Sequence, residues 1–163
     1  MDIKFIPFTE DYIEAAREIY NYYVRNTTVT FHIDDISYDE MKGILFHPDK
    51  RYKTFGIFHE DTLIGYILTV PFKNRGAFRR SGEVTIYLSP QLSGKGIGTK
   101  ALNFIEEEAR NSDIKVLLAV VADENQQSKV LFQKCGYEKC AHFKGVGEKF
   151  GRVLDLVCFE KEL

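Results

Sequence analysis

The sequence contains no tryptophan and only three cysteines among its 163 residues. Three cysteines cannot all pair with one another, and a small secreted disulfide scaffold would carry more of them. Cys135, Cys140 and Cys158 have no second close cysteine pair or histidine pair beside them, so their spacing does not indicate a zinc site. We interpret them as reduced thiols of a cytoplasmic protein, and we expect no metal centre.

Long hydrophobic runs and an excess of one charge are also missing. The longest strongly apolar stretch, Val116–Ala122, is far shorter than the about 20 residues of a membrane-spanning helix. The N-terminus has no basic region followed by an apolar run, so no signal peptide is expected. Lys and Arg number 22 against 24 Asp and Glu, which leaves no global basic field for nucleic acid. We therefore expect neither a membrane nor a nucleic-acid partner.

Aromatic residues are plentiful, with 13 Phe and 9 Tyr, and 44% of all residues are hydrophobic. Such a composition excludes a disordered chain and is typical of a packed globular core. The length suits a single domain over residues 1–163. No internal repeat, low-complexity segment or long linker divides the chain.

Hydrophobic periodicity predicts a mixed α/β domain, antiparallel early and with a βαβ unit in the middle. Thr9 and Ser37 are the expected N-caps of the first two helices. The expected helices are Thr9–Arg25, Ser37–Leu45, Thr99–Arg110 and Asn125–Cys135. The expected strands are Ile3–Phe8, Tyr52–His59, Leu63–Pro71, Glu83–Leu88, Val116–Ala122, Tyr137–Lys144 and Val153–Glu160.

The most informative segment is the turn that joins the strand Glu83–Leu88 to the helix after it. Gly94, Gly96 and Gly98 occupy alternate positions there, and glycine lets backbone approach a ligand closely. The helix N-terminus adds free N–H groups and the positive end of its dipole, which together suit a phosphate or pyrophosphate. The spacing matches neither a Walker loop nor a dinucleotide fingerprint, and a turn that only caps the helix remains an alternative.

Gln91-x-x-Gly94-x-Gly96 resembles the Q/R-x-x-G-x-G/A motif of the GCN5-related N-acetyltransferases, the GNAT superfamily. Asn125 and the Cys135-Gly136-Tyr137 helix end are similar to later parts of the family pattern. The resemblance covers nearly the whole chain. It implies the GNAT fold, a central mixed and mainly antiparallel sheet flanked by helices, with acetyl-CoA as co-substrate. The residues it places at the coenzyme are Ile86, Tyr87, Leu88, Gln91, Gly94, Lys95, Gly96, Ile97, Gly98, Thr99 and Asn125.

In that family the strand before the glycine turn splays from its neighbour. The splay leaves unpaired backbone groups for pantetheine and for the acetyl oxygen, and the Leu88 N–H is the implied donor. An ordinary paired strand is the alternative.

A narrower resemblance is to the phosphinothricin N-acetyltransferases, which include methionine sulfone and sulfoximine acetyltransferases. Four blocks carry it, Ile19–Val24, Thr28–Phe31, Pro71–Phe78 with Glu83–Leu88, and Gly147–Asp155. The resemblance implies transfer to the primary amine of a small amino-acid-like substrate. It also implies a homodimer with the acceptor site near its interface.

Acetyl transfer requires a neutral amine, and the resemblance gives Glu83 the role of the general base that takes the amine proton. The residues alone also fit an exposed glutamate at a strand start. Arg75 is the expected anchor for a substrate carboxylate, since a guanidinium binds it through two hydrogen bonds, although a solvated basic loop is the alternative. The expected neighbours in the acceptor site are Lys73, Asn74, Val84, Thr85 and Phe31. No Ser or Cys has the surroundings of a nucleophile, which favours direct transfer.

The chain departs from its relatives at two positions. Phe132 stands where they carry a Tyr or His that can protonate the coenzyme A thiolate, so water, Tyr137 or another group would have to serve. Val153 stands where relatives carry Trp, which changes the acceptor pocket. Two other functions stay open on the sequence, a protein or peptide N-acetyltransferase and a non-catalytic coenzyme A-binding module.

Overall fold

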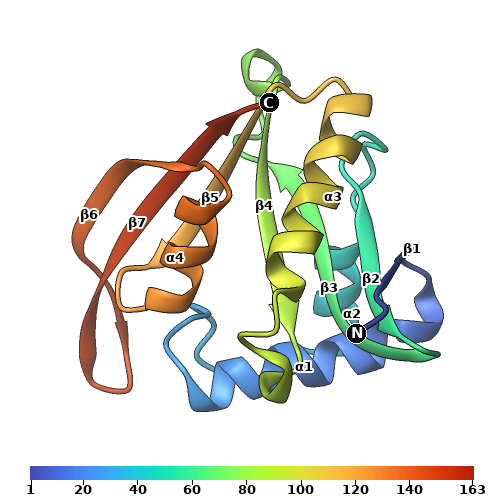
Figure 1. The fold of residues 1–163 in the computed structure, drawn as a ribbon. Helices are drawn as coiled ribbons and strands as arrows, with labels where there is room; N and C mark the ends of the chain where they lie inside the picture. The colour runs from blue at the N-terminus through green and yellow to red at the C-terminus, as the bar shows by residue number, and fades with distance from the viewer.

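The computed structural model describes residues 1–163 and arranges seven strands in one sheet with four α-helices (Figure 1). The strands are β1 (Lys4–Pro7), β2 (Thr54–His59), β3 (Thr62–Pro71), β4 (Ser81–Leu88), β5 (Val116–Ala122), β6 (Glu138–Lys149) and β7 (Arg152–Glu162). The helices are α1 (Ile13–Asn26), α2 (Tyr38–Leu45), α3 (Ile97–Asn111) and α4 (Gln126–Lys134). Short 3-10 turns, η1 (Glu10–Tyr12), η2 (Gly76–Phe78) and η3 (Pro90–Leu92), join some of them.

The strand order across the sheet is β1-β2-β3-β4-β5-β7-β6. Every neighbouring pair is antiparallel except β4 and β5, which run parallel. This arrangement confirms the expected α/β fold with a mixed, mainly antiparallel sheet. No helix is both long and apolar enough to cross a membrane.

The helices cover the two faces of the sheet and bury two apolar clusters (Figure 1). On one face, α3 repeats apolar residues at helical spacing and packs with α4 against the strands. On the other face, α1 and α2 pack against Tyr66 and Leu68 of β3. Successive side chains of a strand point to opposite faces, so Val84 joins the first cluster while Tyr87 packs against the second.

Strands β4 and β5 stay paired over a short distance. Only Ser81, Gly82 and Glu83 have partners on β5, and the last pair is Glu83 with Leu118. Beyond it β4 continues to Leu88 along β3, while β5 continues along β7. The expected splay of the strand before the glycine turn is therefore confirmed, and a gap opens between β4 and β5.

Several element ends differ from the sequence-based expectation. Thr9 makes no side-chain cap hydrogen bond and precedes η1, because Tyr12 leaves helical geometry before α1 begins at Ile13. Ser37 caps α2 as predicted, in a reciprocal capping box with Glu40. The last hairpin is longer than predicted, since Gly145 lies within β6 at an irregularity of the register instead of ending the strand.

Gly65 of β3 lies opposite Leu88 at the end of β4, where β4 no longer pairs with β5, and a substitution there measures how closely β3 and β4 approach. A Cβ on Gly65 would lie 2.5 Å from the carbonyl oxygen of Tyr87, which backbone cannot easily accommodate. We expect Gly65→Ala to destabilise the fold by about 1–3 kcal/mol, as overpacking does. The control is Gly43→Ala in α2, where a Cβ meets no atom within 4 Å and should add about 0.5–1 kcal/mol of helix stability. Urea unfolding measures both, and an equal effect of the two would contradict the close approach.

Candidate functional site

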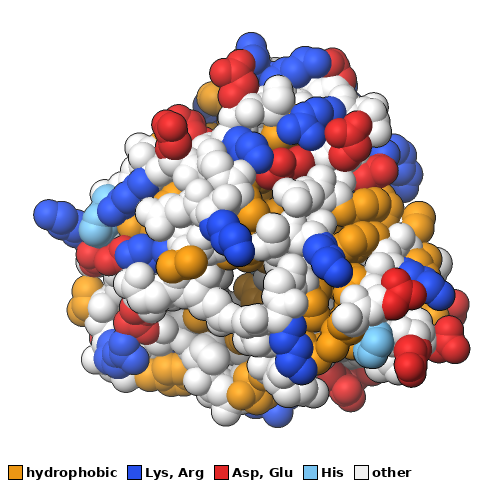
Figure 2. All heavy atoms as spheres, in the orientation of Figure 1, with side chains coloured by type: hydrophobic (Ala, Val, Ile, Leu, Met, Phe, Trp, Pro, Cys, Tyr) orange, Lys and Arg blue, Asp and Glu red, His pale blue; other side chains and the backbone are white.

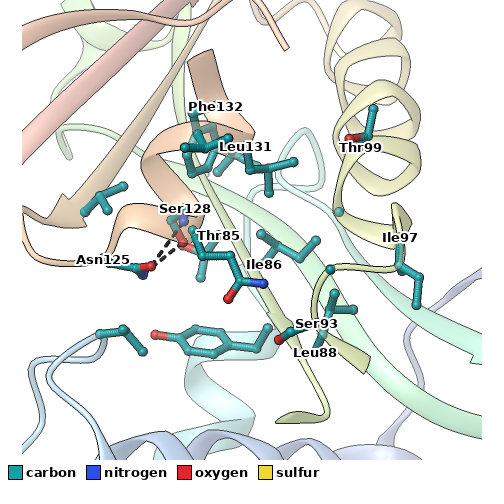
Figure 3. A pocket seen from close by; sticks show the side chains of 18 of the residues that line it. Thr85, Ile86, Leu88, Ser93, Ile97, Thr99, Asn125, Ser128, Leu131 and Phe132 are labelled. Carbon is teal, nitrogen blue, oxygen red and sulfur yellow. Dashed lines mark hydrogen bonds between the residues drawn. The ribbon is translucent and has the colours of Figure 1, made fainter. Parts of the chain in front are cut away.

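A cavity of about 430 Å³ occupies the gap between the diverging strands. Its walls come from the end of β4, the glycine turn, the first turn of α3, the end of β5 and one side of α4 (Figure 3). Figure 2 shows the molecule hollowed near the middle of this face, with several Lys and Arg side chains around the opening. The site is thus built where the sheet is interrupted.

The glycine turn shapes one end of this cavity. Gly94 and Gly96 have φ angles of 79° and 77°, in the left-handed region that side chains disfavour. Gly96 is also the N-cap of α3, and no side chain caps the helix there. Ile97, Gly98 and Thr99, whose backbone N–H groups have no partner within the helix, line the cavity. The helix start is therefore an anion-binding end that opens into the cavity.

Helices α3 and α4 pack against each other at the cavity. A Cβ on Gly98 would lie 2.9 Å from a methyl carbon of Leu131, so a larger residue at this position would require the Leu131 side chain to move. Gln91 and Lys95 are exposed and do not line the cavity, although both belong to the turn. Their place in the motif does not by itself put them against the cavity walls.

The edge of β4 forms the long wall of the cavity. Thr85, Ile86, Tyr87 and Leu88 all line it and have no partner on β5. Tyr23 of α1 donates a hydrogen bond from its hydroxyl to the Leu88 carbonyl oxygen, at 2.6 Å. The sequence does not single out Tyr23 as a site residue, because helical spacing alone does not show that α1 ends beside β4.

Asn125 lies at the opposite wall as the N-cap of α4. Its Oδ1 accepts a hydrogen bond from the Ser128 backbone N–H at 3.1 Å, and its Nδ2 donates to the Ser128 hydroxyl oxygen at 2.9 Å (Figure 3). Both side chains line the cavity. The sequence did not single out Ser128, and its position three residues after a cap is the signal that could have done so.

Phe132 lines the cavity one helical turn after Ser128, with 4% of its surface exposed. Its ring packs edge-on against Tyr137 at 5.1 Å between centroids. Tyr137 itself does not line the cavity, and its buried hydroxyl has no hydrogen-bond partner. Burial raises the pKa of Tyr137 well above its usual range. The hydroxyl-bearing residues of the cavity lining are Tyr23, Thr85, Tyr87, Ser93, Thr99 and Ser128, whereas Tyr137 lies in the core.

Glu83 stands at the last paired position before β4 and β5 diverge. It is half-buried, and burial raises the pKa of its carboxyl while the positive charge of Lys73 opposes that shift. A carboxylate with a raised pKa beside a cavity is a candidate proton acceptor.

The other residues expected at the acceptor site fall into two groups. Val84 and Thr85 line the cavity. Lys73, Asn74 and Arg75 lie exposed in the loop between β3 and β4, and Phe31 is exposed in the loop after α1. The basic side chains of this loop are exposed to solvent near Glu83. The positive charge of Lys73 acts on the Glu83 carboxyl and lowers its pKa.

One group of metal-ligating residues lies outside this cavity. Ligand atoms of Asp123, His142 and Asp155 lie within 4.8 Å of one another. Asp123 already binds Lys129 at 2.8 Å, and Asp155 already binds His142 at 2.8 Å and the Gly145 backbone N–H at 2.8 Å. These bonds give the cluster a structural role at the β6–β7 hairpin.

Comparison with known proteins agrees with this geometry. The model of the acetyltransferase (GNAT) family matches residues 16–137. The phosphinothricin N-acetyltransferase of Streptomyces coelicolor is 26% identical over 166 residues, which span 99% of this chain and 97% of that protein.

Two solved structures match over the whole chain. A ribosomal-protein-alanine N-acetyltransferase from Brucella melitensis is 31% identical, with a TM-score of 0.91 over 100% of both chains. A phosphinothricin acetyltransferase from Sinorhizobium meliloti, solved in complex with acetyl-CoA, is 28% identical, with a TM-score of 0.94 over 100% of this chain and 89% of that one.

The raised pKa of Glu83 has a consequence for stability. Because its folded value lies above the ordinary value of about 4.5, the folded state binds more protons than the unfolded state between the two values. Stability therefore falls as pH rises through that window. The glutamine of Glu83→Gln does not titrate, so the variant lacks this pH-dependent loss. We expect the free energy of unfolding of the variant, relative to that of the wild type, to increase from about pH 4 upward.

Urea unfolding at a series of pH values measures this difference. Glu138→Gln, at an exposed position at the start of β6, is the control and should show no such growing gain. A Glu83→Gln gain that shrinks with rising pH would contradict the assigned effect of burial.

Proposed function

This chain belongs to the acetyltransferase (GNAT) family and uses acetyl-CoA as co-substrate, and we propose that it acetylates the primary amine of a small amino-acid-like acceptor. The transfer is direct, and Glu83 is the general base. The observation that carries this proposal is the place of Glu83, where β4 leaves β5 and the cavity begins. One strand thus brings a proton acceptor and a ligand cavity together.

The residues of the cavity fit coenzyme A. The uncapped start of α3 and the left-handed Gly94 and Gly96 suit the pyrophosphate, since backbone N–H groups can approach it without a Cβ in the way. The unpaired edge of β4 from Thr85 to Leu88 suits the amide groups of the pantetheine arm. Acetyl-CoA supplies an activated thioester, and the Leu88 N–H is our proposed donor to its carbonyl oxygen.

Glu83 takes the proton of the acceptor ammonium, directly or through water, and so frees the nitrogen lone pair for attack. A carbon–nitrogen bond forms to the acetyl carbon as the carbon–sulfur bond breaks, and the electron pair of that bond leaves on sulfur. The nitrogen, positively charged after the attack, then loses a second proton, which reaches the thiolate sulfur through water or a hydroxyl of the cavity wall. Burial raises the pKa of Glu83, which improves its match to a proton transfer near neutral pH. Arg75 and Lys73, exposed in the neighbouring loop, are the proposed partners of the acceptor carboxylate.

The leaving sulfur does not require a strong acid in this site. A thiol has an ordinary pKa of about 8.5, so its thiolate leaves more readily than an alkoxide would. Phe132 cannot donate a proton, and the Tyr137 hydroxyl lies away from the cavity. The hydroxyls of Tyr23 and Ser128, two residues of the cavity wall, are our proposed groups for passing a proton to sulfur.

Glu83→Gln tests the proposed base. We expect kcat/KM for acetyl transfer to fall by about 10²–10⁴, because the amide cannot accept the amine proton. Acetyl-CoA should still raise the melting temperature of the variant, since the coenzyme cavity is unchanged. Thiol release from acetyl-CoA is measured with amino acids, their sulfone, sulfoximine and phosphinic analogues, polyamines and peptides, with Glu138→Gln as the control.

Each other outcome of that panel points to a different function. Turnover on peptides alone would favour the protein acetyltransferase, as the Brucella melitensis neighbour suggests. Coenzyme A binding without turnover on any amine would favour a non-catalytic binding module. Retained activity in Glu83→Gln would remove Glu83 from the mechanism.

We propose further that the protein is a cytoplasmic homodimer. Four large apolar side chains of the β6–β7 hairpin region are exposed, Phe143, Val146, Phe150 and Val153, the last with 69% of its surface accessible. An exposed apolar patch of this kind is typical of a protein interface.

Val153→Glu tests the interface, because a charge placed on the patch would be buried in a dimer. Sedimentation equilibrium of the wild type should give twice the chain mass of 18.8 kDa, and the variant should give a monomer. Lys144→Glu, an exposed charge reversal on β6, is the control. A monomeric wild type would overturn this part of the proposal.

A further inference from the structure

The segment between α1 and α2, residues 27–37, contains no helix or strand. No backbone–backbone hydrogen bond involves residues 28–36. Such a segment keeps its position only through side chains that reach it, because its buried backbone groups still need partners. Val29 of this segment nevertheless lines the cavity proposed for coenzyme A. The contacts that hold Val29 in place are therefore part of the construction of the coenzyme site.

The two threonines that flank Val29 are both buried, and each is held by a different side chain. The Thr30 carbonyl oxygen accepts a hydrogen bond from Lys149 Nζ at 2.9 Å. The Thr28 hydroxyl donates a hydrogen bond to the Glu124 carboxylate. Val29 thus lies between two fixed neighbours.

The end of the β6–β7 hairpin contributes to both of these contacts. Phe150 and Gly151 form a two-residue turn with φ angles of 54° and 69°, the left-handed pattern of a type I′ hairpin. The turn pairs Lys149 directly with Arg152, and opposed residues of an antiparallel pair point to the same face. Arg152 donates a hydrogen bond to the Glu124 carboxylate. The hairpin therefore holds the segment twice, through Lys149 directly and through Arg152 by way of Glu124.

Lys149 is an unusual residue for a buried position. Only 3% of its surface is exposed, and none of the ion pairs of the structure includes it. Its ammonium reaches the Thr30 carbonyl oxygen and lies 5.2 Å from the centre of the Phe150 ring. Burial lowers the pKa of Lys149, which reflects the cost of removing its charge from water. An apolar side chain would avoid that cost, so the lysine is explained by the carbonyl that it holds.

Glu124 shows which part of the cavity the segment reaches. It directly precedes Asn125, the N-cap of α4, and Asn125 lies across the cavity from Ile97 and Thr99 at the start of α3 (Figure 3). Because Thr28 is bonded to Glu124, the segment meets the cavity at the Asn125 end. In the proposed arrangement of coenzyme A, the pyrophosphate lies at the start of α3 and the pantetheine arm extends away from it.

We propose that Lys149 is a positioning residue for the coenzyme site, which keeps Val29 in the wall that meets the pantetheine arm by holding the Thr30 carbonyl oxygen. This inference rests on the proposed placement of coenzyme A. Lys149 does not line the cavity and acts through Val29. Without its bond the segment leaves the wall incomplete in a larger fraction of molecules, and the apparent affinity for the coenzyme falls with the fraction that is complete.

Lys149→Met tests this role, because methionine keeps an unbranched side chain and removes the ammonium. We expect Kd and KM for acetyl-CoA to rise about five- to twentyfold, while kcat at saturating acetyl-CoA stays within about threefold. The melting temperature without ligand should not fall, since the variant no longer buries an unpaired charge. Calorimetric titration, thiol release and thermal unfolding measure these quantities. Lys144→Met, at an exposed position of the same strand, is the control.

A fragment of the coenzyme separates positioning from a general loosening of the fold. 3′-Phosphoadenosine 5′-diphosphate lacks the pantetheine arm, so its Kd should stay within about twofold of the wild-type value in Lys149→Met. Thr28→Val removes the second contact with a side chain of the same shape. It should raise Kd for acetyl-CoA about two- to fivefold and again leave the fragment unaffected.

Equal weakening of acetyl-CoA and of the fragment, together with a lower melting temperature, would make Lys149 a structural residue and overturn the inference. An unchanged Kd for acetyl-CoA in both variants would overturn it as well. Amide hydrogen exchange of residues 28–35 gives a readout independent of activity. It should be faster in Lys149→Met than in the wild type, and acetyl-CoA should reduce the difference.

The failure of the proposed function has a different signature. A wild type that binds acetyl-CoA and acetylates no amine would overturn the proposed transfer, whereas the inference is decided by binding alone. Transfer by the wild type with no effect of Lys149→Met on acetyl-CoA affinity would overturn the role of Lys149 and leave the transfer intact.

Discussion

The early end of the β4–β5 ladder is the constraint on which the rest of this structure depends. Parallel neighbours in a sheet normally keep their backbone groups paired, but here pairing ends at Glu83. The groups beyond that point need other partners, and the cavity gives a bound molecule access to them. The same divergence exposes the start of α3 to the gap. Ligand space, free backbone groups and a helix N-terminus thus have one structural origin.

Strand β4 serves two surfaces because its side chains alternate. Val84 and Leu88 face the cluster under α3, while Glu83 and Tyr87 face α1 and α2. A ligand on either side of the strand therefore meets a different row of side chains. The backbone edge between the two rows belongs to both. In the proposed reaction this edge is where the two substrates meet.

Much of the fold follows from local signals in the sequence. The glycine turn, the N-cap at Ser37 and the buried strand Val116–Ala122 each have a local chemical cause, and the structure confirms them. The place of Tyr23 and Ser128 in the cavity wall could not be predicted, because it depends on which helices and strands become neighbours. Gln91 and Lys95 were expected at the coenzyme, but both are exposed and do not line the cavity. A motif fixes the spacing of residues along the chain and leaves the direction of each side chain undetermined.

Helix α1 lines the coenzyme cavity and also a second cavity, of about 270 Å³, on the other face of the sheet, through residues one turn apart. Tyr20 lines the second cavity, and Tyr23 lines the first and holds the Leu88 carbonyl oxygen. A rotation of this rigid element would move both tyrosines together, so a ligand that fixes one also restricts the other. Any coupling that α1 transmits between the two spaces would be reciprocal, so that a ligand in each would change the affinity for the other by the same factor.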